Sequence, residues 1–167
     1  MVEVDVTKLS LGPVDLWMNR WLLLTAGTPD DCNMMTVSWG SIGCMWSMPF
    51  VQIFVRPQRH TYKYTETSDS FTLCAFPEKY RRDLQILGAL SGRDGDKLSK
   101  TGLTLKESKK VSAPSYNEAN LILECRKIYC QDIDPRGFVD SAIQDNYPVN
   151  DYHRVYFGEI LAAFGEE

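Results

Sequence analysis

Short apolar segments, separated by residues that favour turns, dominate the chain and constrain its fold more than any other feature. Residues 21–25 (WLLLT) end at a Gly/Pro/Asp cluster, and residues 50–55 (FVQIFV) end at an Arg-Pro pair. Apolar runs of about four to eight residues bounded in this way are typical of β-strands. The predicted strands cover residues 21–25, 34–39, 50–55, 71–76, 121–130 and 153–161.

Helical patterns interrupt these strands in only a few places. The polar segment 60–68 lacks the alternation of a strand, and Pro77 favours the first turn of a second helix. That helix ends at the polar loop 91–97 (SGRDGDK), and a short helical stretch to Thr101 is expected after it. The apolar stripe of the second helix comprises Tyr80, Leu84, Leu87 and Leu90.

This order of elements predicts a mainly β protein, a β-barrel with a few helices. A doubly wound α/β sheet needs strict alternation of strands and helices. The chain lacks that alternation, and it also lacks the GxGxxG and GxxxxGK[ST] phosphate-binding motifs. The 167 residues suit a single domain, residues 1–167, because no repeat or linker divides them.

Charge, hydropathy and histidine content disfavour several classes of function. The net charge of −4 disfavours nucleic acid as a partner, and no apolar run approaches the ~20 residues that span a bilayer, so no membrane is expected. The acidic N-terminus has no apolar segment and is unlike a signal peptide, so the cytoplasm is the expected location. The two histidines lack paired ligand spacing, which predicts no metal site.

The chain has five cysteines, an odd number without CxxC spacing. Reduced thiols are therefore expected, as small core residues, with one reactive thiol as the alternative. If Cys125 and Cys130 share one strand, their odd separation places them on opposite faces. The five are Cys32, Cys44, Cys74, Cys125 and Cys130.

Two segments have the composition of a binding site. In residues 33–43 (NMMTVSWGSIG), small and polar residues lead into glycines, which leaves room for a planar group against the backbone. The alternative is a barrel strand whose Thr36 and Ser38 face solvent. Residues 56–62 (RPQRHTY) lie where a strand ends and a helix begins, so free N–H groups and arginines there favour a phosphate. A solvated basic loop is the alternative for this segment.

A third segment and one histidine add to this set. The glycines of loop 91–97 let backbone N–H groups approach an anion, and Lys97 adds a positive charge, whereas a helix-breaking turn is the alternative. His153, at the start of the last predicted strand, is suited to donate a proton or position a substrate. The alternative for His153 is a hydrogen bond within the structure. No other acid–base or nucleophile constellation is present in the sequence.

Taken together and in order, these segments resemble the flavin reductase-like family, whose fold is an FMN-binding split β-barrel. Residues 33–43, 55–64, 71–97 and 151–160 carry the resemblance, which extends from about residue 21 to residue 160. The branch it resembles most is that of the flavoredoxin-like flavoproteins. The resemblance implies FMN as cofactor, and a homodimer in which the flavin lies near the interface between two chains.

The resemblance also implies roles for individual residues. Those expected to line the isoalloxazine ring are Asn33, Met34, Met35, Thr36, Val37, Ser38, Trp39 and Gly40. Those expected around the phosphate and ribityl chain are Arg56, Arg59, Thr61, Tyr62, Ser91, Gly92 and Lys97. His153 is the expected catalytic residue, and either Trp39 or Trp46 is expected to cover the ring.

Three functions are consistent with these expectations. The leading prediction, from the resemblance, is an enzyme: an NAD(P)H-dependent flavin reductase that takes hydride from a transient NADH or NADPH donor. The second is an electron carrier that exchanges electrons with a redox protein such as a ferredoxin. The third is a non-catalytic flavin-binding protein. The motifs support FMN binding equally in the first two and do not separate them.

Overall fold

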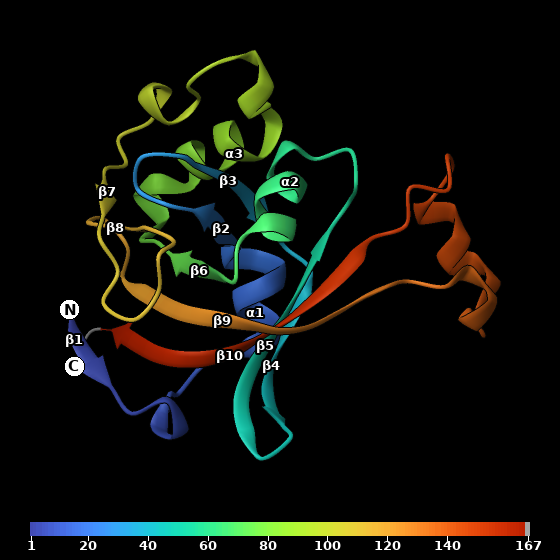
Figure 1. Cartoon of the computed structure of the whole chain (residues 1–167), viewed down its shortest axis with the longest axis horizontal. Coiled ribbons are helices and arrows are strands. Elements are labelled where there is room, and N and C mark those ends of the chain that lie inside the picture. The colour runs from blue at the N-terminus through green and yellow to red at the C-terminus, as the bar shows by residue number, and fades with distance from the viewer. Residues whose placement is uncertain (166–167) are drawn as a thin grey trace.

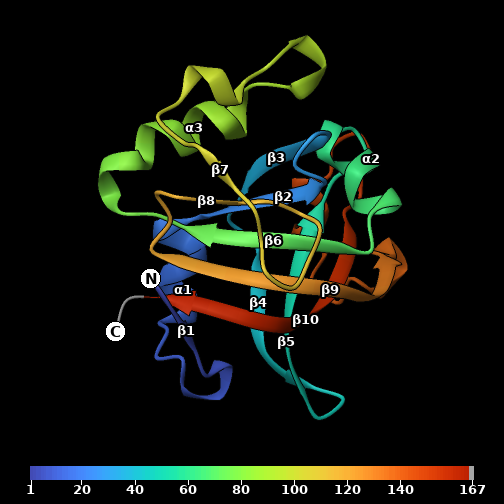
Figure 2. The same cartoon turned by 60° about the vertical axis from the view of Figure 1, so that its left-hand side comes forward.

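The computed structural model describes residues 1–165, and a curved antiparallel sheet organises them (Figures 1 and 2). Within these residues the strand order is β3-β2-β6-β9-β10-β5-β4, and β1 also pairs with β10. This confirms the predicted mainly β fold. The strands are β1 (Val2–Val4), β2 (Leu22–Gly27), β3 (Cys32–Val37), β4 (Gly40–Met45), β5 (Met48–Val55), β6 (Ser70–Ala75), β7 (Leu105–Lys106), β8 (Ser115–Tyr116), β9 (Leu121–Asp132) and β10 (Arg154–Gly165).

The longer helices cover one end of this sheet. Helix α2 packs against β2 and β3, and α3 packs against β3, so both lie at the same end in Figure 1. The helix predicted from Pro77 begins as a 3-10 turn, and Leu90 lies just beyond its end with 37% of its surface exposed. The helices are α1 (Pro13–Asp15), α2 (His60–Thr67) and α3 (Arg81–Ala89), with a π turn at Leu16–Arg20 and 3-10 turns at Val6–Lys8, Glu78–Tyr80, Gly92–Asp94, Leu98–Lys100, Pro135–Gly137 and Ser141–Asn146.

Apolar side chains on both faces of the sheet explain the continuous apolar run at residues 21–25. Leu22 and Leu24 of β2 belong to the core inside the barrel. Leu23, which points the other way, joins Leu84 and Leu87 of α3 in a second core on the outer face. A strand between two cores needs apolar residues at every position, because successive side chains alternate between faces.

The hairpin of β4 and β5 was only partly predicted. The strand expected over residues 34–39 ends at Val37, and β4 begins at Gly40. The hairpin turns at Trp46 and Ser47, whose φ angles are +51° and +60°. Turns with two positive φ angles normally contain glycine or asparagine. Neither residue is present here, so this turn carries no local signal in the sequence.

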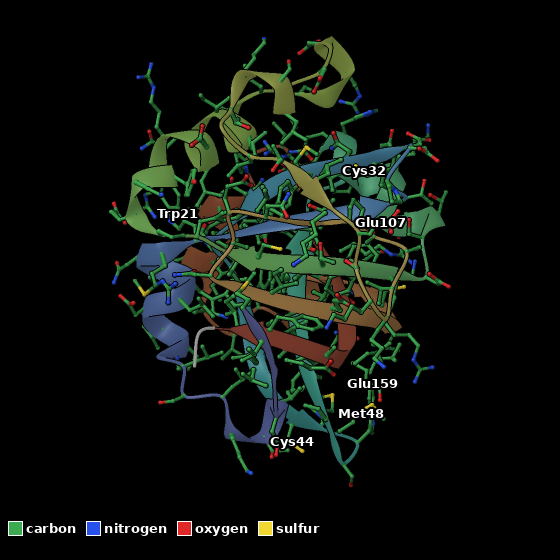
Figure 3. The ribbon with its side chains drawn as sticks, turned by 90° about the vertical axis from the view of Figure 1, so that its left-hand side faces the viewer. Trp21, Cys32, Cys44, Met48, Glu107 and Glu159 are labelled. Carbon is green, nitrogen blue, oxygen red and sulfur yellow. The ribbon has the colours of Figure 1, made fainter. Side chains whose placement is uncertain are left out.

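A β-bulge corrects the prediction for Cys125 and Cys130. In β9, Lys127 pairs with Gly158 and Tyr129 with Phe157, so Ile128 is an extra residue on one strand. The extra residue reverses the alternation, and both cysteines therefore pack against the core inside the barrel. All five cysteines are free thiols in the described chain, and Figure 3 shows Cys32 and Cys44 at opposite ends of the sheet.

The connection between β9 and β10 projects from the barrel as an arm, defined here as residues 133–152 (Figure 1). Its own small cluster stacks Phe138 and Tyr152 against Tyr147, which is only 2% exposed. The arm ends immediately before His153, which precedes β10 and does not begin it as predicted. The fold thus places the arm beside His153, the histidine that the sequence analysis predicted to be catalytic.

Candidate functional site

Two pockets adjoin along β3 and share Met35 as a lining residue. The first is a cavity of about 170 Å³ between the N-terminus of α2 and the C-terminus of α3, and we call it the anion pocket. The second, of about 270 Å³, lies between the end of β3 and β5, and we call it the aromatic pocket. The two pockets therefore lie next to each other, on either side of Met35.

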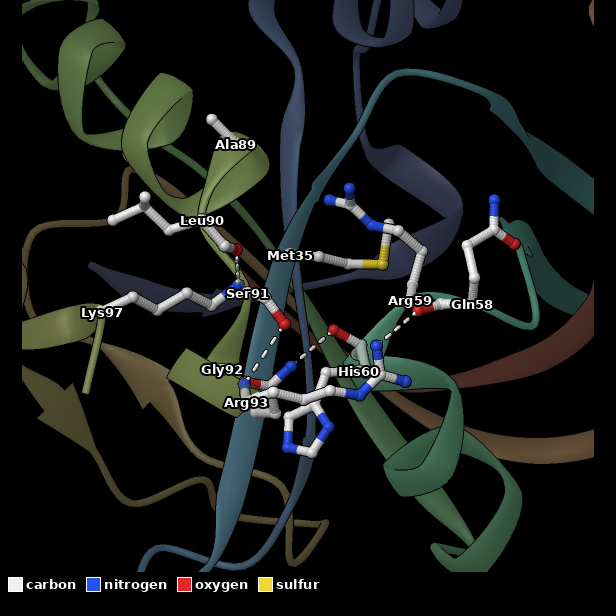
Figure 4. Close-up of a pocket in the computed structure, with 12 residues that line it drawn as sticks. Met35, Gln58, Arg59, His60, Ala89, Leu90, Ser91, Gly92, Arg93 and Lys97 are labelled. Atoms are coloured by element: carbon white, nitrogen blue, oxygen red, sulfur yellow. Dashed lines mark hydrogen bonds between the residues drawn. The ribbon is translucent and has the colours of Figure 1, made fainter. Parts of the chain in front are cut away.

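Polar and cationic groups surround the anion pocket (Figure 4). Arg59 donates to the carbonyl oxygen of Gly88 at 2.6 Å, which ties the start of α2 to the end of α3. Arg93 donates to the carbonyl oxygen of Gln58 at 3.0 Å, so the loop after α3 is tied to the same segment. These contacts leave further guanidinium N–H groups available to an anion in the pocket.

The N-terminus of α2 faces this cavity without a side-chain cap. Its N-cap residue is Arg59, and the next two residues, His60 and Thr61, also line the pocket. Uncapped N–H groups in the first turn of a helix favour an anion, through hydrogen bonds and through the helix dipole. The first N–H groups of α2 and the guanidinium groups of Arg59 and Arg93 therefore all favour an anion in this one pocket.

Asn33 and Thr61 form the buried floor of the anion pocket. The Asn33 amide donates to Thr61 Oγ1 at 2.7 Å, and the Thr61 hydroxyl donates to the carbonyl oxygen of Met34 at 3.3 Å. A Cβ at Gly92 would lie 2.2 Å from Asn33 Oδ1 and 2.9 Å from a ring carbon of His60. Gly92 is thus needed for close contact with this floor, whereas the sequence analysis assigned the glycine to backbone approach toward an anion.

Lys97 closes the pocket from the α3 side. Its ammonium donates to the carbonyl oxygens of Leu87 at 2.9 Å and Leu90 at 3.1 Å, which satisfies the last turn of α3. Burial, together with the positive charge of Arg59, lowers the pKa of Lys97 to about 8. Two of its three donors are used within the protein, so Lys97 supports the loop as well as facing the cavity.

Aromatic side chains line the second pocket. The ring centroids of His153 and Trp39 lie 5.0 Å apart, and Phe54 meets the His153 ring edge-on at 6.2 Å. Thr36 and Ser38 add hydroxyl groups, although Thr36 Oγ1 donates to the carbonyl oxygen of Leu84 at 2.5 Å. The pocket therefore combines flat apolar surfaces with a few hydrogen-bonding groups, as sites for planar ligands do.

His153 is buried and held by the arm. Its Nδ1 lies 2.9 Å from the hydroxyl of Tyr147. Burial lowers the pKa of His153 to about 4, and the positive charge of Arg56 acts in the same direction. The imidazole is therefore neutral at pH 7.

The position of Arg56 differs from the prediction. Arg56 lines the aromatic pocket and not the anion pocket. Its guanidinium donates to Asp151 Oδ2 at 2.6 Å and to the carbonyl oxygen of Asn146 at 2.8 Å, and it lies 5.0 Å from the centre of the Tyr147 ring. The Arg56 guanidinium is thus paired with groups of the arm and lies outside the anion pocket.

Gly40, Met34 and Tyr62, which were also expected at the site, line neither of the two pockets. A Cβ at Gly40 would lie 2.3 Å from the ring of Trp17, so the space beside this glycine is filled by a tryptophan. Met34 belongs to the core beneath α3, and Tyr62 packs against the core inside the barrel.

The remaining predicted residues divide between the two pockets. The aromatic pocket contains Met35, Thr36, Val37, Ser38, Trp39, Arg56 and His153, and the anion pocket contains Asn33, Met35, Arg59, Thr61, Ser91, Gly92 and Lys97. Sequence reasoning did not single out Gln58, His60, Arg93 or Phe54, which line them too. The first three lie in segments that it had selected, whereas Phe54 carried no signal beyond its place in a buried strand.

The fold defines a class of protein, the split β-barrels, whose solved members include FMN-binding proteins. The structure resembles that of an FMN-binding domain of a flavin reductases-like enzyme from Shewanella baltica, with a TM-score of 0.70 and 19% identity over 97% of this chain and 75% of that one. It also resembles the flavoredoxin of Methanosarcina acetivorans, with a TM-score of 0.68 and 21% identity over 100% of this chain and 76% of that one.

Sequence comparison identifies the family. The model of the "Flavin reductase like domain" matches residues 19–166, so the chain belongs to the flavin reductase-like family, as the sequence analysis predicted. An uncharacterised protein of Pyrococcus abyssi is 28% identical over 150 residues, which cover 88% of this chain and 74% of that protein.

Neither a membrane-spanning helix nor a cluster of metal ligands was found in the part of the chain that the structure describes. Each helix of residues 1–165 is too short or too polar to cross a membrane. The same residues contain no group of three or more His, Cys, Asp or Glu side chains placed to hold a metal ion.

Proposed function

We propose that this chain binds FMN across the two pockets and acts as an NAD(P)H-dependent flavin reductase. The observation that carries the proposal is the junction of the pockets at Met35. FMN has a phosphate at one end and a planar, partly apolar ring system at the other. A cationic cavity that adjoins an aromatic one matches the charge of the phosphate end and the planar, partly apolar character of the ring end.

On the phosphate side, the proposal assigns Arg59, Arg93 and the first N–H groups of α2 to the anion. Ser91 and Lys97 lie on the opposite wall of the same cavity. Arginine donors and helix N–H groups bind phosphate oxygens well because the hydrogen bonds are assisted by charge. Arg56 is left out of this set because Asp151 already neutralises it.

On the ring side, Trp39 and Phe54 supply flat surfaces, and the backbone of residues 36–39 supplies hydrogen-bonding groups. A bound flavin would supply the redox chemistry, because it accepts hydride and releases electrons singly or in pairs. The residues of the chain hold and orient it, and His153 presents a neutral imidazole to the same pocket.

The proposal includes a homodimer, for which the outer face of the sheet beside the aromatic pocket is the candidate interface. Phe50, Val155 and Phe157 form an apolar cluster on that face. Trp46 and Tyr129 border Phe157, yet they are 58% and 44% exposed. Exposed aromatic residues next to an apolar cluster are typical of protein–protein interfaces.

A second candidate function is that of an electron carrier. Flavoredoxins of Methanosarcina acetivorans and Desulfovibrio vulgaris share the fold, with TM-scores of 0.68 and 0.69. Such a carrier would use the same two pockets for FMN and would exchange electrons with a redox protein. The two functions therefore differ in what reduces the flavin.

Binding of FMN and of riboflavin to an Arg59→Ala variant tests the phosphate site. Loss of a charge-assisted hydrogen bond is expected to weaken FMN binding by about 10- to 100-fold. Riboflavin lacks the phosphate, so its affinity should change little. Arg82→Ala, an exposed arginine on α3, is the matched control. Equal losses for both ligands would refute the phosphate assignment, and wild-type protein that binds neither would refute the proposed function.

Anaerobic reduction of the FMN-loaded protein separates the enzyme from the carrier. Rapid bleaching of the bound flavin by NADH or NADPH supports the reductase and identifies its donor. A flavin that stays oxidised with both nicotinamides but is reduced by a ferredoxin supports the carrier. No bleaching by any of these donors would refute both.

A further inference from the structure

Tyr147 of the arm contacts His153, which lines the aromatic pocket. The proposed function does not account for this contact. His153 is 8% exposed, and Trp39, Phe54 and Tyr147 surround its ring. An imidazole enclosed on three sides by aromatic rings has a fixed orientation. Within residues 1–165, its Nδ1 bonds Tyr147 and its Nε2 has no protein partner.

Hydrogen-bond accounting selects one tautomer of this histidine. A neutral imidazole has one donor nitrogen and one acceptor nitrogen. If Nδ1 carried the hydrogen, it would donate to Tyr147, and the hydroxyl hydrogen of that buried tyrosine would have no acceptor among the described residues. If the Tyr147 hydroxyl donates to Nδ1, this buried pair is satisfied, and the hydrogen of His153 is on Nε2, which opens onto the aromatic pocket and is not a fully buried atom. An unsatisfied buried donor costs about 1–3 kcal/mol, so the second arrangement is strongly favoured.

Tyr147 is itself held in place from several sides. Phe138 stacks on its ring with 6.1 Å between centroids, and Tyr152 contacts it at 5.0 Å. The Arg56 guanidinium lies 5.0 Å from the ring centre and is anchored by Asp151. Arg56 from the end of β5 and Asp151 from the arm are the charged groups that act on His153, and their effects oppose each other. The contacts of Arg56 therefore place the tyrosine that bonds the histidine.

We propose that Tyr147 is a positioning residue that holds His153 as the Nε2–H tautomer, so that the aromatic pocket offers its ligand a neutral hydrogen-bond donor. The ligand class that fits is a planar ring with an acceptor atom, a carbonyl oxygen or an unprotonated ring nitrogen. The assignment of that ligand rests on the proposed function. The tautomer itself is a property of the protein without any ligand.

Nitrogen-15 spectra of the flavin-free protein test the proposal directly. The chain has two histidines, so a His60→Gln variant assigns both sets of signals. Wild-type protein near neutral pH is expected to show His153 with its hydrogen on Nε2 alone. Tyr147→Phe keeps the aromatic stack but removes the donor, and a mixture of both tautomers is expected. Tyr152→Phe is the matched control, because its hydroxyl bonds Gln144 and Asn150 and not the histidine.

With FMN bound, Tyr147→Phe is expected to slow flavin reduction by the nicotinamide about 3- to 10-fold. A wild-type histidine with its hydrogen on Nδ1, or a Tyr147→Phe variant that keeps the Nε2–H form alone, would overturn the proposal. Failure of the protein to bind FMN would refute the proposed function. The tautomer would still be tested, because the nitrogen-15 spectra are recorded without flavin.

Discussion

At the scale of single residues, burial sets the charge of the groups that line the two pockets. It lowers the pKa of Lys97 to about 8 and that of His153 to about 4. Both side chains make hydrogen bonds that keep them in place whether or not they are charged. The anion pocket therefore contains an ammonium that is easily neutralised, and the aromatic pocket contains an uncharged imidazole.

The depressed pKa of Lys97 makes stability depend on pH. Between pH 8 and pH 10.5, unfolded Lys97 is protonated whereas folded Lys97 is neutral. Unfolding then takes up a proton, so the free energy of unfolding should rise with pH over this range, by about 3 kcal/mol relative to a Lys97→Met variant. Urea denaturation of both proteins below and above this range measures the difference. If the difference in free energy of unfolding between the two proteins were the same at both pH values, the prediction of a lowered pKa for Lys97 would be wrong.

Gly92 tests the packing of the pocket floor. In Gly92→Ala, the new Cβ would lie 2.2 Å from Asn33 Oδ1, so the loop must move away from the floor. FMN affinity is expected to fall by about 10-fold or more, because the donors of the loop move with it. Gly137→Ala, where nothing lies within 4 Å, is the control. Flavin titration followed by fluorescence measures both, and equal affinities would show that the loop position does not matter.

At the scale of elements, the two glycines of β4 differ in how much space surrounds them. A Cβ at Gly40 would lie 2.3 Å from Trp17 and 2.6 Å from the carbonyl oxygen of Gln52. A Cβ at Gly43 would meet only Phe50, at an ordinary 3.6 Å. Gly40 is thus the point where Trp17 and the π turn that carries it pack against the hairpin.

Matched alanine substitutions in β4 separate scaffold from binding site. Gly40→Ala is expected to lower the free energy of unfolding by about 2–4 kcal/mol, because backbone as well as the indole must shift. Gly43→Ala should change it by less than about 1 kcal/mol. Chemical denaturation measures both. A Gly40→Ala protein that is as stable as wild type but fails to bind flavin would instead support a role for Gly40 in the binding site.

At the scale of the whole molecule, the barrel leaves an aromatic surface beside the aromatic pocket. Trp46 lies at the tip of the β4–β5 hairpin, and its ring contacts Tyr129 of β9 and Phe157 of β10. The tip of the hairpin and two strands therefore combine to form the surface that the proposed dimer would cover. An interface there would bring a second chain close to the pocket that contains His153.

Sedimentation of a Trp46→Ser variant tests this interface. If the surface pairs two chains, removing an exposed indole from it should weaken the dimer by about 10-fold or more. Val14→Ser, which alters a side chain that is 69% exposed in α1, should leave the association unchanged. A wild-type protein that is monomeric at all concentrations, or a Trp46→Ser dimer as stable as wild type, would contradict the proposed interface.

The sequence by itself determined the strand-rich class of the fold and the segments that carry the site. Apolar runs and turn residues are local signals, so the six predicted strands correspond to β2, β3, β5, β6, β9 and β10 with shifted ends. Only the tertiary structure separated Arg56 from Arg59, placed Trp17 against Gly40, and brought Tyr147 to His153. Arg56 bonds Asp151, 95 positions away, and no local pattern encodes such a contact. Tertiary packing decides which of several similar side chains remains free for a ligand.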